Sequence, residues 1–141
     1  MTSIVSSLTI NQIRSLSTTA IANFTSDDVA ALSSAQIKAL SSSQIAAFET
    51  EDLTAFSSDQ IAAVSIGSIV GLNATQLAVL TSSHIGGLSA KHVSALSTGQ
   101  IAALGSEQVE ALNATQIAAL SGAALSTMTS DEVATFSTDE I

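Results

Sequence analysis

Large apolar residues return along the chain with a fixed period of eight. Every position divisible by eight, from Leu8 to Phe136, is Leu, Phe, Val or Met. Every position five residues after a multiple of eight, from Val5 to Ile141, is Ile, Val or Leu. We number each octad from 1 to 8, so that the two apolar series occupy positions 5 and 8. Because the phase is never interrupted, we predict a single solenoid domain over residues 1–141, with about seventeen repeats and no linker.

The polar positions of the octad indicate the start of a helix. Position 1 is Ser, Thr or Asn in fifteen of seventeen octads, the exceptions being Glu49 and Gly105, and position 4 is Gln, Glu or Asp in twelve of seventeen. This is the spacing of a capping box, and the apolar residues on either side occupy the positions of a hydrophobic staple. We therefore predict one short capped helix of about one and a half to two turns in each octad.

Two other conformations fit the period poorly. In one continuous helix the apolar stripe would drift by about 80° per octad, so no face would stay apolar. In one continuous strand, positions 5 and 8 would face opposite sides. A β-solenoid with a turn in each octad remains the alternative, but Ala and Gln are poor strand formers. The predicted fold class is accordingly all-α, a solenoid of short capped helices.

Such an octad cannot be stable by itself, because two large buried side chains do not offset the entropy of ordering eight residues. Stacking of successive octads must supply the rest. Position 7 is small from Ser15 to Thr135, except at Asn23 and Val79, which would let neighbouring helices approach closely. Either two or three octads per coil fit this pattern.

Composition and charge exclude several classes of partner. Twelve acidic residues against three basic ones give a net charge of −9, which disfavours nucleic acid and anionic membrane surfaces. No apolar run approaches the length of a membrane span, so we expect no membrane insertion. The first residues do not have the pattern of a signal peptide. The absence of Cys excludes disulfides and Cys-ligated metal.

Runs such as Leu-Ser-Ser-Ser-Gln-Ile-Ala-Ala-Phe at 40–48 and Leu-Ser-Thr-Gly-Gln-Ile-Ala-Ala-Leu at 96–104 carry a resemblance to a known type of repeat. They resemble the tandem octapeptide repeats of very large exported bacterial proteins, which are labelled adhesin-like or autotransporter-like. The resemblance covers the whole chain and brings no catalytic motif with it. It implies an extracellular or cell-surface location in a bacterium.

Few residues suggest chemistry, and each has a simpler explanation. His84 and His92 lie one octad apart and could bind a metal, but both occupy position 4, where Gln usually completes the cap. The acids lack the spacing of a calcium loop. The many Ser and Thr lack a nucleophile elbow, and every position recurs along the array, whereas catalysis needs a unique constellation. We therefore predict no catalytic, cofactor-binding or metal-binding residue and no enzymatic activity.

These observations favour a structural role. We expect an extracellular stalk or the subunit of a head-to-tail filament, because the sequence opens in phase and closes on Ile141 without a polar capping repeat. The alternative is an adhesive module that binds proteins or glycans, and ice or surface binding is a third choice. Glycosylation sequons at Asn23, Asn73 and Asn113 also occur, although Asn73 and Asn113 fall at the cap position, which favours Asn anyway.

Overall fold

The computed structural model describes residues 3–134, and these residues form short helices throughout, with no strand. Phe136 and Ile141, the last members of the two apolar series, lie outside the described residues. The helical solenoid is therefore confirmed, and the β-solenoid alternative is wrong for the part of the chain that is described. The elements are η1 (Val5–Ser7), α1 (Ile10–Ser15), α2 (Thr18–Ala22), α3 (Ser26–Ala31), α4 (Ser34–Lys38), α5 (Ser42–Ala46), α6 (Thr50–Thr54), α7 (Ser58–Ala63), α8 (Ile66–Ile69), α9 (Ala74–Ala78), α10 (Ser82–Gly87), α11 (Ala90–Ala95), α12 (Thr98–Ala102), α13 (Ser106–Glu110), α14 (Ala114–Ala118), α15 (Gly122–Leu125) and α16 (Ser130–Ala134).

The break between helices uses ordinary extended backbone. Leu16, at position 8, has φ −63° and ψ 134°, and Ser17, the next cap residue, has φ −71° and ψ 159°. Two successive extended residues are enough to turn the chain into the next helix. No described residue has a positive φ. The connections therefore need no glycine in the left-handed region, which explains why Gly is scarce at the repeat boundary.

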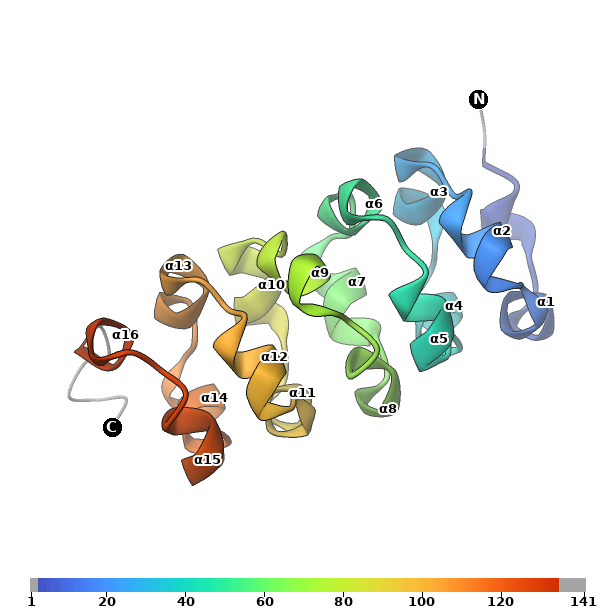
Figure 1. The fold of residues 1–141 in the computed structure, drawn as a ribbon. Helices are drawn as coiled ribbons and strands as arrows, with labels where there is room; N and C mark the ends of the chain where they lie inside the picture. Colours follow the sequence, from blue (N-terminus) through green and yellow to red (C-terminus); the bar gives the residue numbers. More distant parts are fainter. Residues whose placement is uncertain (1–2, 135–141) are drawn as a thin grey trace.

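Three octads make one coil of the solenoid. Each helix packs against the helices three before and three after it in the chain, as α7 packs against α4 and α10. Figure 1 shows the resulting elongated rod, with the two ends of the chain at opposite ends. The rings of Phe24 and Phe48, which are one coil apart, meet edge to face with their centroids 6.0 Å apart. The structure thus selects three octads per coil from the two arrangements that the sequence allows.

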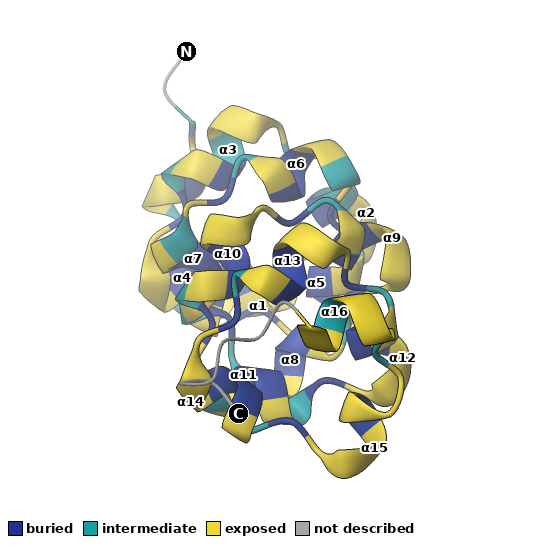
Figure 2. Ribbon diagram, turned by 90° about the vertical axis from the view of Figure 1, so that its left-hand side faces the viewer, coloured by how far each residue is buried: buried dark blue, intermediate teal, exposed yellow. Residues whose placement is uncertain are grey.

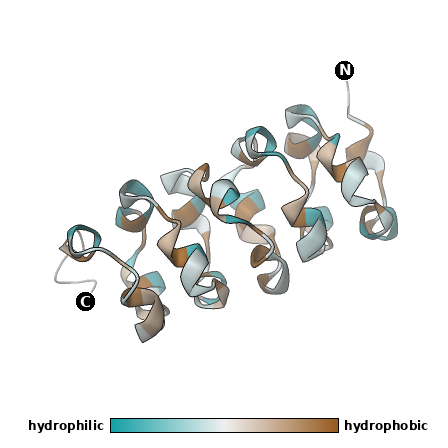
Figure 3. Cartoon of the chain, viewed as in Figure 1, coloured by the Kyte–Doolittle hydropathy of each residue, from teal (hydrophilic) through white to brown (hydrophobic). Residues whose placement is uncertain are grey.

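The core is a continuous apolar column inside the coil. Figure 2, viewed along the rod, shows the buried residues on the inner faces of the helices and the exposed residues on the outside. The colouring by hydropathy in Figure 3 follows the same division. Position 5 is buried from Val5 to Ile117, and position 8 is buried from Leu32 to Leu120. Both predicted apolar series therefore form the core, and the burial of their side chains stabilises the fold.

Position 7 is where one coil rests on the preceding one. A Cβ atom added to Gly87 would lie 3.1 Å from the carbonyl oxygen of Ser58, and one added to Gly71 would overlap the carbonyl of Ser42. Both serines occupy position 2 of the octad below in the same stack. The small residues at position 7 thus permit the close approach that the sequence predicts.

Candidate functional site

In most octads from α4 to α14, the side chain at position 4 joins the octad to the preceding coil. In α5, the Oε1 atom of Gln44 accepts a hydrogen bond from the backbone N–H of Ser41 at 2.9 Å, which completes the capping box. Its Nε2 atom donates to the backbone carbonyls of Ile13 at 2.8 Å and Leu16 at 2.9 Å. These carbonyls lie at the C-terminal end of α1, where that of Ile13 also accepts from the N–H of Leu16 and that of Leu16, the C-cap residue, has no backbone N–H partner. One glutamine therefore caps the start of one helix and the end of another.

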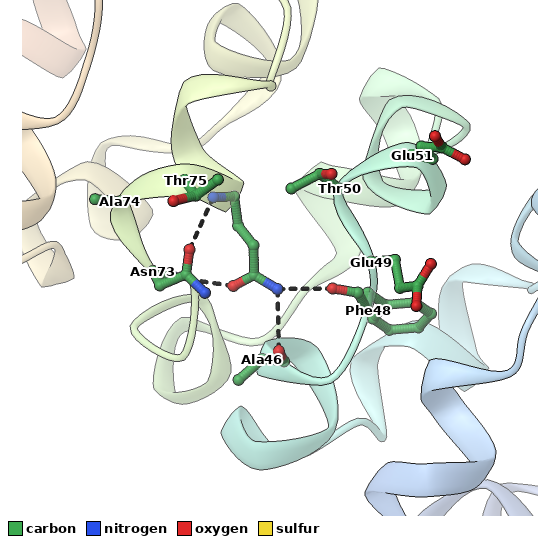
Figure 4. Close-up of a pocket in the computed structure, with 9 residues that line it drawn as sticks. Ala46, Phe48, Glu49, Thr50, Glu51, Asn73, Ala74 and Thr75 are labelled. Carbon is green, nitrogen blue, oxygen red and sulfur yellow. Dashed lines mark hydrogen bonds between the residues drawn. The ribbon is translucent and has the colours of Figure 1, made fainter.

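This arrangement repeats around the coil and along the rod as a series of buried polar side chains, which we call the amide ladder. The amide of Gln76 bridges the backbone of Asn73 and the carbonyls of Ala46 and Phe48, and Figure 4 labels these three partners and marks the hydrogen bonds as dashed lines. No buried side-chain nitrogen or oxygen of the described residues lacks a partner. The amide ladder thus satisfies buried backbone groups that would otherwise destabilise the core. Its buried members are Gln36, Gln44, Asp52, Gln60, Ser68, Gln76, His84, His92, Gln100, Gln108 and Gln116.

The two histidines replace glutamine in the amide ladder. In His84, Nδ1 accepts from the backbone N–H of Thr81 at 3.1 Å, and Nε2 lies 2.6 Å from the carbonyl oxygen of Phe56. His92 bonds in the same way to Ser89 and to the carbonyl of Val64. Because Nδ1 must accept and Nε2 must donate, both rings are bound as the neutral tautomer with the proton on Nε2. The predicted capping role of both residues is confirmed.

The hydroxyl of Ser89 lies 2.8 Å from Nδ1 of His92, a pairing that resembles a nucleophile beside its base. The same two octad positions face each other in every complete capping box, for example Ser97 and Gln100. His92 is buried, and its second nitrogen is held by a backbone carbonyl rather than a carboxylate. Among residues 3–134 there is also no group of three or more His, Cys, Asp or Glu that could hold a metal ion.

Ser68 is a shortened member of the amide ladder. Its hydroxyl donates to the carbonyl of Leu40 at 2.7 Å and accepts from the hydroxyl of Ser65 at 2.7 Å, so Ser65 makes no side-chain cap. A serine reaches the preceding coil only if its helix lies closer than usual. Gly71, three residues further on, permits this, because a Cβ atom there would overlap the carbonyl of Ser42.

Asp52 is the charged member of the amide ladder. Burial raises the pKa of its carboxyl group, and the neighbouring carboxylate of Glu49 raises it further. Ionised Asp has no hydrogen to donate, so it cannot serve the carbonyls of the preceding coil as Gln does. The pKa of Asp28, at the same octad position, is instead lowered. The hydroxyl of Ser3 donates to its carboxylate at 2.5 Å, and the backbone N–H of Thr25 donates as well, so the ionised form is favoured.

The outer surface carries a repeated shallow groove between coils. One copy runs from the end of α5 to the start of α9, lined by Phe48, Thr50, Asn73 and Thr75 among others. A second copy lies four octads further along, where Leu80, Ser82, Gly105 and Glu107 replace those residues. The linings are small and polar apart from the edge of the core. Such a groove offers hydrogen-bonding groups at regular intervals along the rod.

The sequence pattern located every member of the amide ladder except Ser68, but it assigned the ladder only half of its role. Position 4 was predicted to cap its own helix, which the structure confirms for Gln, His and Asp28. The bonds to the preceding coil were missed, because they depend on three octads per coil. The predominance of Gln over Glu was the available signal, since an amide can accept and donate at once, whereas a carboxylate can only accept.

None of the helices within residues 3–134 is long and apolar enough to span a membrane. No curated protein and no solved structure matches the chain. The model of the ALTTAQ repeat matches it four times, over residues 5–42, 34–66, 45–90 and 92–122. These matches cover most of the sequence and coincide with the coiled array of capped octads. The chain is a tandem-repeat protein that belongs to the ALTTAQ repeat family.

Proposed function

We propose that this chain is a structural scaffold without catalytic activity, which serves as an extracellular stalk or as the subunit of a head-to-tail filament. The observation that carries the proposal is the amide ladder. The same bonds join each coil to the one before it, from Gln36 to Gln116, so the rod lengthens without any change of structure. Such nearest-neighbour construction suits a spacer or a fibre.

The two ends of the described rod support extension by stacking. Leu8, Leu16 and Phe24 are only partly buried, although position 8 is buried from Leu32 onward. At the other end, the exposed fractions of Leu125 and Val133 are 37% and 41%. Another coil placed on either end would cover this apolar surface. Further repeats of a longer chain would provide a stalk, and a second copy would provide a filament.

Gln12 supports the same proposal. Its Oε1 atom accepts from the backbone N–H of Thr9 at 2.8 Å, as in the other capping boxes. Its side chain is exposed, and no described residue accepts a hydrogen bond from Nε2. A coil docked against α1 would offer carbonyls at the place where Gln44 finds those of Ile13 and Leu16.

Electron microscopy of the purified chain over a concentration series tests the filament. Uniform fibres are expected at high concentration, and Leu8→Glu should shorten them because it places a charge in the end contact. Separate short rods at every concentration would reject the filament and leave the stalk.

For the proposed location, antibody labelling of intact bacterial cells that produce the protein should give a surface signal. Labelling only after lysis would reject it.

The repeated groove favours a second candidate, an adhesive solenoid that binds a repetitive glycan. Its copies at Phe48–Asn73 and Leu80–Gly105 present similar small polar linings four octads apart. Weak contacts at regular intervals gain strength through multivalency. A glycan array probed with the purified chain tests this candidate, and binding should strengthen with glycan length. Failure to retain any oligosaccharide or polysaccharide would reject it.

A further inference from the structure

Two of the three basic residues of this acidic chain meet at one groove on the side of the rod. Arg14 on α1 and Lys38 on α4 occupy position 6 of octads that stack directly on one another. Both line a surface depression with Ile10 and Ala35. A second depression, which shares Ala35 and Lys38 with the first, extends it to Ile66 at the start of α8. We call this continuous surface the basic groove, formed by Ile10, Arg14, Ala35, Lys38, Ala62 and Ile66.

The basic groove has no partner within the molecule. Neither Arg14 nor Lys38 forms an ion pair with any described residue, and both side chains are exposed. Ile66 is 41% exposed, although the chain has few large apolar side chains on its surface. Exposed apolar area flanked by unpaired cations is suited to an acidic partner surface.

The same two coils carry an acidic surface on another side of the rod. Asp27 on α3, Glu49 at the cap of α6 and Glu51 on α6 are all exposed, and we call them the acidic ridge. In Figure 4 the carboxylates of Glu49 and Glu51 point away from Asn73. In Figure 1, α3 and α6 lie along the upper edge of the rod, whereas α1 and α4 lie along its lower edge. One molecule therefore cannot bring its own ridge to its own groove.

We propose that the basic groove binds the acidic ridge of a second copy of this chain, so that rods associate side by side. The groove and the ridge occupy the same pair of coils, so two rods in register and parallel bring them together without an axial shift. Because the two surfaces differ, the contact is heterologous, and each added copy presents a further groove and ridge. This lateral contact is independent of the end-to-end stacking proposed above.

Sedimentation velocity of the full chain tests the proposal. At a given concentration, the weight-average mass should be larger at about 0.02 M salt than at about 0.5 M salt, where exposed charges are screened. End-to-end stacking through apolar surfaces would persist at the higher salt, so the two modes are distinguishable. A chain that stays monomeric at low salt and high concentration would overturn the lateral contact.

Charge reversal identifies the surfaces. Lys38→Glu should weaken the low-salt association about tenfold, whereas Lys91→Glu, the same change at the exposed lysine of α11, should leave it nearly unchanged. An equal loss in both variants would show that only net charge matters and would overturn the proposal.

Glu51→Lys should also weaken self-association, and a mixture of the Lys38→Glu and Glu51→Lys chains should regain it. Circular dichroism of each variant confirms that its fold is intact, and a folded mixture that stays monomeric would equally contradict the pairing.

Discussion

Gln44 and Leu16 are joined across one coil of the rod: Nε2 of Gln44 donates a hydrogen bond of 2.9 Å to the backbone carbonyl of Leu16. The same amide group accepts from the cap N–H of Ser41 and donates to the carbonyl of Ile13. Residues 28 positions apart are thereby held by a single buried side chain. The stability of this fold consequently depends on polar bonds between coils as well as on its apolar core.

Replacement of one rung of the amide ladder should be costly. Gln44→Ala leaves the cap N–H of Ser41 and the carbonyl of Leu16 without their partner and removes one of two hydrogen bonds to the carbonyl of Ile13, which we expect to lower the free energy of unfolding by about 2–3 kcal/mol. Gln12→Ala is the matched control, because Gln12 is exposed and only caps its own helix. It should cost about 0.5–1 kcal/mol. Urea unfolding followed by circular dichroism measures both, and equal losses would show that the bonds between coils contribute little.

Asp52→Gln should stabilise the protein at neutral pH by about 1–2 kcal/mol. Glutamine removes a buried charge and can donate to the preceding coil as Gln44 does. Burial and Glu49 raise the pKa of Asp52, so the folded state holds the proton more tightly than the unfolded state. At a pH above the raised pKa of Asp52 in the folded state, its ionisation therefore lowers the stability of the wild type. This loss of stability is recovered as the pH falls from that raised pKa toward the ordinary value of 3.8.

The advantage of Asp52→Gln over the wild type should accordingly shrink as the pH is lowered. Unfolding curves measured at a series of pH values down to about 3 check this. Asp59→Asn serves as the control for the loss of one carboxylate, because Asp59 is exposed, and it should change stability little. An advantage that grows toward acid pH would contradict the assignment of Asp52 as the charged member of the amide ladder.

His84→Gln should preserve stability within about 1 kcal/mol, because Oε1 and Nε2 of glutamine can replace Nδ1 and Nε2 of the ring. His84→Ala should lose about 2–3 kcal/mol, since the N–H of Thr81 and the carbonyl of Phe56 would then lack their partner. Nitrogen NMR of the wild type at neutral pH should show the proton on Nε2 in both His84 and His92. A proton on Nδ1 would rule out the hydrogen bonds described here.

Two glycines of one octad should respond in opposite directions. Gly71→Ala places a Cβ atom against the backbone carbonyl of Ser42, and we expect a loss of about 1–3 kcal/mol. Gly67→Ala meets nothing within 4 Å and lies inside α8, so better helix propensity should add about 0.5–1 kcal/mol. Thermal unfolding of the two variants distinguishes them. Loss of stability in both would indicate a general intolerance of α8 rather than a close approach of coils.

The sequence allowed the identification of the core and the caps because both depend on local spacing. Ile13 and Leu40 belong to the two apolar series that recur every eight residues, so their burial could be predicted without knowledge of the coil. Ser41 and Gln44 are three residues apart, which is the distance over which a capping box acts. By contrast, the basic groove brings together Arg14, Lys38 and Ile66, which are related only through the stacking of coils.

The sequence by itself determined that this protein is an array of short capped helices with two apolar residues in each octad. It did so because capping and apolar periodicity are properties of neighbouring residues. Only the tertiary structure decided that three octads form a coil and that the amide of Gln44 reaches the end of α1. The crossing between successive helices sets both features, and it results from the packing of side chains in the shared core, which no single octad contains.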